Sequence, residues 1–139
     1  MRSLRSAALL LAWIVSVVAT LGSLYFSEIR HFVPCTMCWY QRIAMYPLII
    51  ILGIAAYRDD RQIARYILPI SSLGILFAVY QILLQNIPGF DPIKLCSIGV
   101  PCSTKYVDYF GFISIPVMSL TAFVLITLLL SLVARGEKR

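Results

Sequence analysis

An uncharged run near the start of the chain limits its fold more than any other feature. From Ala7 to Phe26 the sequence holds 20 residues without a charge. At about 1.5 Å of rise per residue, a helix of that length spans about 30 Å, the thickness of the hydrocarbon core of a bilayer. Because lipid offers no hydrogen bonds, a spanning segment must pair its own backbone groups. The run is therefore predicted to be a transmembrane helix.

Three further apolar segments have similar lengths: 38–57, 66–85 and 109–134. The whole chain is 60% hydrophobic and 13% charged, against about 45–50% and about 25% in soluble domains. No repeat, low-complexity stretch or long linker divides it. The expected fold is all-α, a polytopic four-transmembrane-helix bundle forming one domain over residues 1–139, with outer loops 27–37 and 86–108.

A cleaved signal peptide is the alternative for the first segment. Arg2 and Arg5 precede it, and Val18-Ala19-Thr20 resembles a small-residue cleavage site. The apolar core of a signal peptide is usually about 7–15 residues long, which is shorter than this run. We therefore expect the segment to remain as a helix.

The basic residues give the orientation. They total 12 against 6 acidic residues, but they form short clusters between the apolar runs, which is typical of topology signals rather than of a nucleic-acid surface. Arg42 is set aside because it lies within an apolar segment. Three of the others flank one side, namely Arg30, Lys94 and Lys105. Eight flank the other, namely Arg2, Arg5, Arg58, Arg61, Arg65, Arg135, Lys138 and Arg139. The positive-inside rule then places both termini and the 58–65 loop in the cytoplasm.

All four cysteines, Cys35, Cys38, Cys96 and Cys102, fall in or beside the two segments predicted to face outward. The outer side is the oxidising side, where disulfides persist. Sequence alone allows three ways of pairing four cysteines. A purely structural role is one interpretation, yet Cys35-Thr36-Met37-Cys38 is a CxxC, the spacing of redox dithiols, and both pairs enclose too few residues to constrain an unfolded chain much. Two redox-active pairs are the favoured interpretation.

Four thiolates could instead bind zinc or copper. The second pair has a spacing of five residues, which is wider than the two to four residues of most structural zinc sites. An oxidising compartment also removes the thiolate ligands by forming disulfides. No metal site is therefore predicted.

Arg42 follows Cys38 by four positions, one helical turn deeper on the same face. A charge inside a membrane helix is costly, so it needs a partner or a function. A snorkelling arginine that anchors the helix is one interpretation. The other interpretation is functional. Arg42 and the free N–H groups at the start of the second helix stabilise a Cys38 thiolate during disulfide exchange. The guanidinium also binds a carbonyl oxygen of an acceptor dissolved in the membrane.

The stretch Pro34-Cys35-Thr36-Met37-Cys38-Trp39-Tyr40-Gln41-Arg42 resembles the P-C-x-x-C-x-Y-x-R motif of the DsbB family of disulfide-forming quinone reductases, and the resemblance extends over essentially the whole chain. Asp108-Tyr109-Phe110-Gly111-Phe112 resembles the opening of the family's fourth helix. The short second cysteine loop is most similar to the BdbC-like branch of Bacillus-type bacteria, which favours menaquinone over ubiquinone and a bacterial cell membrane.

The resemblance implies an order of events. Cys96, paired with Cys102, would be attacked by a thioredoxin-like extracytoplasmic dithiol protein of the DsbA or BdbD type. Cys35 and Cys38 would then receive the electrons, with Cys38 against a quinone ring and Arg42 polarising a quinone oxygen. The quinone site would be the apolar space among the outer helix ends.

Two departures from the family accompany the match. Gram-negative members usually carry a horizontal helix between the second pair of cysteines, for which Cys96 to Cys102 leave no room. They also have a histidine near the outer end of the third helix, where this chain has Tyr80-Gln81-Ile82. The single histidine, His31, lies in the first outer loop and is interpreted as a solvated interface residue.

Two alternative functions are weighed against the enzyme. Vitamin K epoxide reductases share four helices and a CxxC, but their CxxC comes in the last helix and not before the second. A non-catalytic membrane subunit or thiol-metal chaperone would also place cysteines outside. Arg42 argues against a chaperone, because a fixed cation beside the thiolate would compete with the metal.

Overall fold

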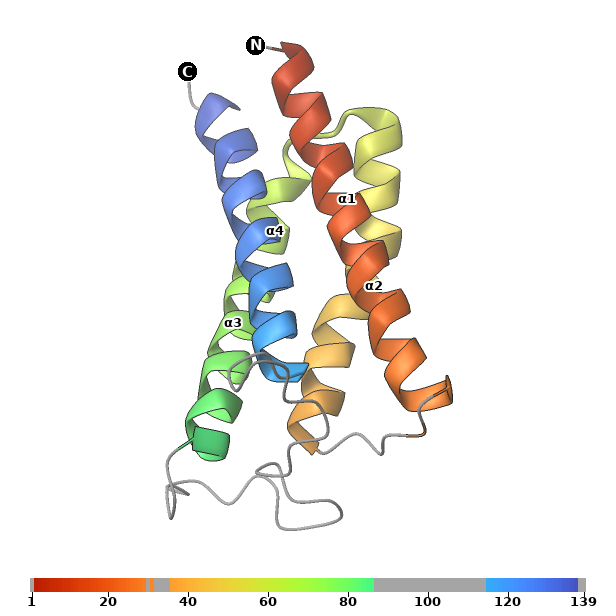
Figure 1. The fold of residues 1–139 in the computed structure, drawn as a ribbon. Coiled ribbons are helices and arrows are strands. Elements are labelled where there is room, and N and C mark those ends of the chain that lie inside the picture. Colours follow the sequence, from red (N-terminus) through yellow and green to blue (C-terminus); the bar gives the residue numbers. More distant parts are fainter. Residues whose placement is uncertain (1, 30, 32–35, 87–114, 138–139) are drawn as a thin grey trace.

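The computed structural model describes residues 2–29, 31, 36–86 and 115–137, and these residues form an all-helical bundle (Figure 1). Helix α1 spans Arg2–Leu24 and passes into a π-helical turn, η1, at Tyr25–Ile29. The others are α2, α3 and α4, at Thr36–Arg58, Ile63–Asn86 and Ile115–Glu137. Each of the four is long and apolar enough to cross a membrane. The chain is thus an all-α protein with four helices capable of spanning a bilayer.

The helices extend beyond the apolar runs that mark them in the sequence. Helix α1 begins at Arg2 where the run begins at Ala7, and α3 begins at Ile63 where the run begins at Tyr66. Hydropathy detects the lipid-covered part, whereas helical hydrogen bonding continues into the polar flanks. The expected start of the fourth helix, at Tyr109, lies outside the described residues.

Successive helices run in opposite directions (Figure 1). The start of α1, the end of α4 and the turn between α2 and α3 lie at one end of the bundle (Figure 1). Helix α1 contacts α2 and α4, and α3 contacts the same two helices, so the four form a ring. This antiparallel order puts the start of α2 beside the end of α1.

The core lies along the axis of the ring. Its largest fully buried apolar side chains are Leu9, Leu48, Leu52, Ile67, Phe123, Ile126, Leu130 and Val133. Leu9 comes from the first predicted segment, so α1 is an integral part of the bundle. The outer faces also carry many apolar side chains, including Leu11, Ile50 and Leu128. Such surfaces are costly in water, and lipid covers them in a membrane protein.

Helices α3 and α4 approach closely because of a glycine. A methyl group placed on Gly74 would overlap the ring of Phe123, which is fully buried. One turn further along α4, the Thr127 hydroxyl lies 2.9 Å from the Ser71 hydroxyl. Small side chains at helix contacts are the usual way for membrane helices to pack without a hydrophobic driving force between them.

The turn between α2 and α3 is held by polar contacts. Asp59 has a φ of 53°, the left-handed conformation that often ends a helix. Its carboxylate accepts from the Ser6 hydroxyl at 2.8 Å and pairs with Arg61 at 2.9 Å. The Asp60 carboxylate accepts from the Gln62 N–H at 3.1 Å, which forms an Asx turn just before α3. These contacts tie the start of α1 to the turn.

Candidate functional site

Cys35, Cys96 and Cys102 lie outside the described residues, and for Cys38 the structure describes the backbone only. That backbone forms the third residue of α2, which begins at Thr36. The N–H groups of a helix's first turn have no partner within the helix, and they carry its partial positive charge. Position 38 is therefore within the region of α2 where an anion is stabilised, one turn before Arg42.

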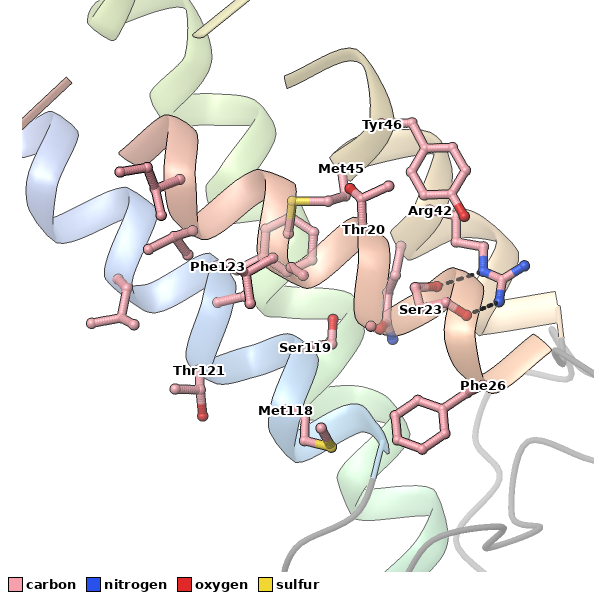
Figure 2. A pocket seen from close by; sticks show the side chains of 18 of the residues that line it. Thr20, Ser23, Phe26, Arg42, Met45, Tyr46, Met118, Ser119, Thr121 and Phe123 are labelled. Carbon is pink, nitrogen blue, oxygen red and sulfur yellow. Dashed lines mark hydrogen bonds between the residues drawn. The ribbon is translucent and has the colours of Figure 1, made fainter. Parts of the chain in front are cut away.

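Arg42 is bound to α1 through Ser23 (Figure 2). Its Nε donates to the Ser23 hydroxyl at 2.9 Å, and its Nη2 donates to the Ser23 carbonyl oxygen at 3.1 Å. The centre of the guanidinium also lies 5.4 Å from the ring centroid of Trp39, within the range of a cation–π contact. The arginine is thus held between α1 and α2 by contacts with both helices.

The partners that hold Arg42 are all neutral. They are a hydroxyl, a carbonyl and an indole ring, and within the described residues the ion pair is Arg61 with Asp59 instead. No described carboxylate compensates the Arg42 charge. A guanidinium in this state can polarise a carbonyl oxygen, or stabilise negative charge on it, more strongly than a paired one can.

A cavity of about 450 Å³ lies between α1, α2 and α4, with Arg42 in its wall (Figure 2). That volume is within the range of about 300–1,000 Å³ usual for small-molecule sites. It is lined by Ile14, Val15, Val18, Ala19, Thr20, Gly22, Ser23, Phe26, Ser27, Gln41, Arg42, Met45, Tyr46, Met118, Ser119, Thr121, Ala122, Phe123 and Leu125. The wall is largely apolar, with a few polar groups from α1 and α2 facing one another.

The cavity reaches the lipid-facing surface between α1 and α4. Ile14 and Val18 of α1 line it and are 42% and 63% exposed. Met118 and Leu125 of α4 line it and are each 43% exposed. Because the exposed side chains are apolar, a hydrophobic molecule dissolved in the bilayer could reach the cavity without crossing water.

A buried amide pair positions one wall of the cavity. Gln41 Nε2 donates to Gln81 Oε1 at 2.7 Å, and the two side chains are only 6% and 2% exposed. Gln41 lines the cavity from α2, while Gln81 comes from α3. Gln81 belongs to the Tyr80-Gln81-Ile82 stretch, which was compared above with the histidine of the Gram-negative proteins. The structure thus gives that stretch a helix-to-helix contact beside the cavity.

Sequence reasoning selected Arg42 but missed Thr20, Ser23, Tyr46 and the glutamine pair. A signal for part of this set was present, because Ser16, Thr20, Ser23 and Ser27 follow one another at intervals of four, three and four residues. That spacing places four hydroxyls on one face of α1. His31, by contrast, is exposed, has a φ of 56° and does not line the cavity.

Comparison with known proteins gives a consistent result. The family model described as "Disulfide bond formation protein DsbB" matches residues 5–133. The chain is 51% identical over 127 residues to Disulfide bond formation protein C of Bacillus subtilis (strain 168), covering 91% of each chain. No solved structure matches the chain.

Two other similar proteins come from different bacteria. A Probable disulfide formation protein of Coxiella burnetii (strain Dugway 5J108-111) is 49% identical over 130 residues, which is 93% of this chain and 88% of that protein. Probable disulfide formation protein C 2 of Bacillus cereus (strain ATCC 10987 / NRS 248) is 42% identical over 139 residues, covering 100% of this chain and 99% of that protein. With a family match over nearly its whole length and relatives that it covers end to end, the chain belongs to the DsbB family of disulfide bond formation proteins.

Proposed function

We propose that the chain is a membrane thiol–disulfide oxidoreductase that re-oxidises an extracytoplasmic thioredoxin-like dithiol protein and passes the electrons to membrane quinone. Disulfide bond formation is the general activity of the family to which it belongs, and that family is generally linked to quinone. The finer statements, on partner, acceptor and cysteine order, are our proposal. In the net reaction a dithiol loses two electrons and two protons and becomes a disulfide, while a quinone gains both and becomes a quinol.

One observation carries the proposal. An apolar cavity that reaches the lipid-facing surface has the guanidinium of Arg42 in its wall, one helical turn from position 38 of the CxxC, and no carboxylate of the described residues forms an ion pair with it. Such a cavity suits a lipid-soluble acceptor with a carbonyl oxygen. An oxygen bound by Arg42 would lie close to the start of α2, which is the region where a cysteine thiolate is stabilised.

The four cysteines act in an order under this proposal. A partner thiolate attacks Cys96 of the Cys96–Cys102 disulfide, and the resulting mixed disulfide resolves to give an oxidised partner and a reduced pair. Thiol–disulfide exchange then passes the two electrons to Cys35 and Cys38. These two close to a disulfide again as the quinone is reduced, with Cys38 as the sulfur facing the ring and Arg42 binding the quinone oxygen.

The orientation is part of the same proposal. Both termini and the 58–65 loop, which carry the excess of Lys and Arg, would face the cytoplasm, so that the CxxC and the second cysteine pair face the outside of a bacterial cell membrane. Membrane-impermeant thiol reagents applied to intact cells would label the reduced cysteines in this orientation. Labelling that occurs only after the cells are broken would indicate the opposite orientation of the chain.

Menaquinone is proposed as the acceptor, ahead of ubiquinone. The support is the high identity to the Bacillus subtilis protein and the short loop between Cys96 and Cys102 that resembles the Bacillus branch. A direct comparison of a naphthoquinone and a benzoquinone analogue with equal side chains would decide it. A higher kcat/KM for the benzoquinone would contradict this choice.

The test uses the full-length chain in lipid vesicles, supplied with a reduced thioredoxin-like dithiol protein and a soluble quinone analogue. Quinone absorbance should fall in step with partner oxidation, at one quinone per dithiol. Cys38→Ser should abolish quinone reduction, whereas Ser72→Ala, which changes an exposed hydroxyl on α3, should leave the rate unchanged. Absence of quinone reduction by the unaltered chain would overturn the proposal.

A further inference from the structure

Three buried polar atoms in the described parts of the chain have no hydrogen-bond partner: the Thr20 hydroxyl oxygen, the Tyr46 hydroxyl oxygen and Arg61 Nε. The first two line the same cavity (Figure 2). Thr20 is only 7% exposed as a whole residue. A buried hydroxyl without a partner destabilises the fold, so its presence in a binding cavity calls for a ligand that completes it.

Along their helices, Thr20 and Tyr46 stand at a similar level. Thr20 precedes Ser23 by three residues on α1, and Tyr46 follows Arg42 by four residues on α2. Because α1 and α2 are antiparallel, both steps lead in the same direction, away from the start of α2 and into the bundle (Figure 2). Along the two helices, Thr20 and Tyr46 therefore lie about one turn, or about 5.4 Å, deeper than Ser23 and Arg42.

We infer that Thr20 and Tyr46 form a second hydrogen-bonding position, which binds the far oxygen of the molecule whose near oxygen is bound by Arg42. This rests on the proposed quinone-reducing function and adds the residues that bind the second oxygen of a 1,4-quinone. The two oxygens of such a molecule lie on opposite sides of one six-membered ring, a separation that matches one helical turn. The ring then lies lengthwise along α2, and its apolar faces contact the cavity wall.

The two positions differ in what they can bind. A guanidinium has only donors, so Arg42 favours a carbonyl or a negatively charged oxygen. A hydroxyl can donate or accept, so Thr20 and Tyr46 can donate to the carbonyl of the quinone and accept from the O–H of the quinol. When the reaction adds two electrons and two protons to the ring, the Thr20–Tyr46 position keeps its hydrogen bond by reversing its direction. Arg42 can only donate, so its hydrogen bond is weakened when its oxygen is protonated, because the oxygen of a neutral quinol hydroxyl is a poorer acceptor than a negatively charged one.

This difference predicts a distinct kinetic pattern. Thr20→Val and Tyr46→Phe should each raise the KM for quinone about 3–10-fold, the loss expected for a neutral hydrogen bond, and should raise the Ki for quinol by a similar factor. Arg42→Ala should raise the KM for quinone by more, with a smaller effect on the Ki for quinol. Thr127→Val and Tyr57→Phe are the matched controls, because neither residue lines the cavity, and both should keep the KM of the unaltered chain.

Stability without ligand provides a second measurement, independent of turnover. If the hydroxyls serve only a ligand, Thr20→Val and Tyr46→Phe should leave the melting temperature of the quinone-free protein unchanged or raise it. The rise in melting temperature on adding a quinone analogue should become smaller. A merely structural role predicts the reverse, a lower melting temperature and an unchanged quinone-induced rise.

The outcomes separate this inference from the proposed function. If the unaltered chain reduces quinone but the Thr20→Val and Tyr46→Phe variants keep its KM, Ki and quinone-induced rise, the second position is wrong and the function stands. If the unaltered chain reduces no quinone, the function is wrong, and the melting measurements still decide whether the hydroxyls bind one. Thr20→Ser should have the same KM as the unaltered chain, since serine keeps the hydroxyl.

Discussion

Arg42 and Ser23 are joined by two hydrogen bonds, from Nε to the hydroxyl at 2.9 Å and from Nη2 to the carbonyl oxygen at 3.1 Å. The carbonyl also accepts from the Ser27 hydroxyl at 3.2 Å, just where α1 passes into its π-helical turn. One serine thus uses its backbone and side chain to hold a charged group of the neighbouring helix. The arginine is oriented before any ligand arrives, which lowers the entropy lost on binding.

Changing Ser23 and Arg42 should separate charge from orientation. Arg42→Ala removes a charged hydrogen bond, so the KM for quinone should rise about 10–100-fold. Ser23→Ala keeps the charge but frees the side chain, and the KM should rise about 3–10-fold. Arg42→Lys should lie between them, because an ammonium group lacks the planar fork that reaches two acceptors of Ser23 at once. Steady-state quinone reduction at a fixed dithiol concentration measures all three, and an unchanged KM in Arg42→Ala would remove the role given to this residue.

The Gln41–Gln81 pair should behave as one unit in a double-mutant cycle. Replacing either glutamine by leucine removes the buried amide–amide hydrogen bond, so each change should lower the free energy of unfolding by about 1–3 kcal/mol. The double variant should lose less than the sum of the two, because the same hydrogen bond is lost only once. Unfolding in mild detergent measures the effect. Gln62→Leu, at an exposed side chain, is the control, and strict additivity of the two buried changes would contradict the pairing.

Gly74 should tolerate no larger residue. Gly74→Ala places a methyl group on the ring of Phe123, and overpacking of this kind usually costs about 1–3 kcal/mol. Phe123→Leu should recover part of that loss in the Gly74→Ala background, although it destabilises the unaltered chain. Gly22→Ala is the matched control, because nothing lies within 4 Å of the added methyl group. It should stabilise α1 by about 0.5–1 kcal/mol. Equal effects at both glycines would contradict the close contact between α3 and α4.

Gly22 also gives access to the cavity without disturbing the core. It lines the cavity from α1, and a side chain there meets open space. Gly22→Leu should therefore fold normally and fill part of the space that the quinone needs. Quinone reduction should fall at least tenfold, while a single stoichiometric oxidation of the partner dithiol by the existing disulfides should remain.

Rapid-quench thiol counting resolves the two activities in the Gly22→Leu variant. Loss of both together would mean that the substitution damages the fold rather than the quinone site. A normal melting temperature would be the independent check. Normal quinone turnover would show that the cavity is not the site of reduction.

The roles proposed for the four cysteines still rest on spacing and resemblance. Cys35, Cys96 and Cys102 lie outside the described residues. For Cys38 the structure gives the position of the backbone, which is near the start of α2. In a Cys102→Ser variant, the free Cys96 thiolate can attack the disulfide form of the partner and displace one of its sulfurs, and identifying this mixed disulfide by mass would test whether Cys96 is the sulfur that meets the partner. A trapped adduct on Cys35 or Cys38 would reverse the order.

The sequence by itself determined the number and type of the elements. Runs such as Ala7–Phe26 are long enough to cross lipid, and a chain in lipid must satisfy its backbone within a helix. The CxxC with Arg42 one turn later also sufficed to indicate the family, since those residues are adjacent along one helix. The ends of the helices were less well predicted, because hydropathy reports the lipid boundary and not the last backbone hydrogen bond.

Only the tertiary structure decided which residues face one another. In a soluble helix the polar face marks the outside, but in a membrane both the lipid and the core are apolar, so composition leaves the rotation of each helix about its axis undetermined. That rotation is what brings Ser23 to Arg42, Gln41 to Gln81, and Thr20 and Tyr46 into one cavity. It is fixed by packing between helices far apart in sequence, such as Gly74 of α3 against Phe123 of α4.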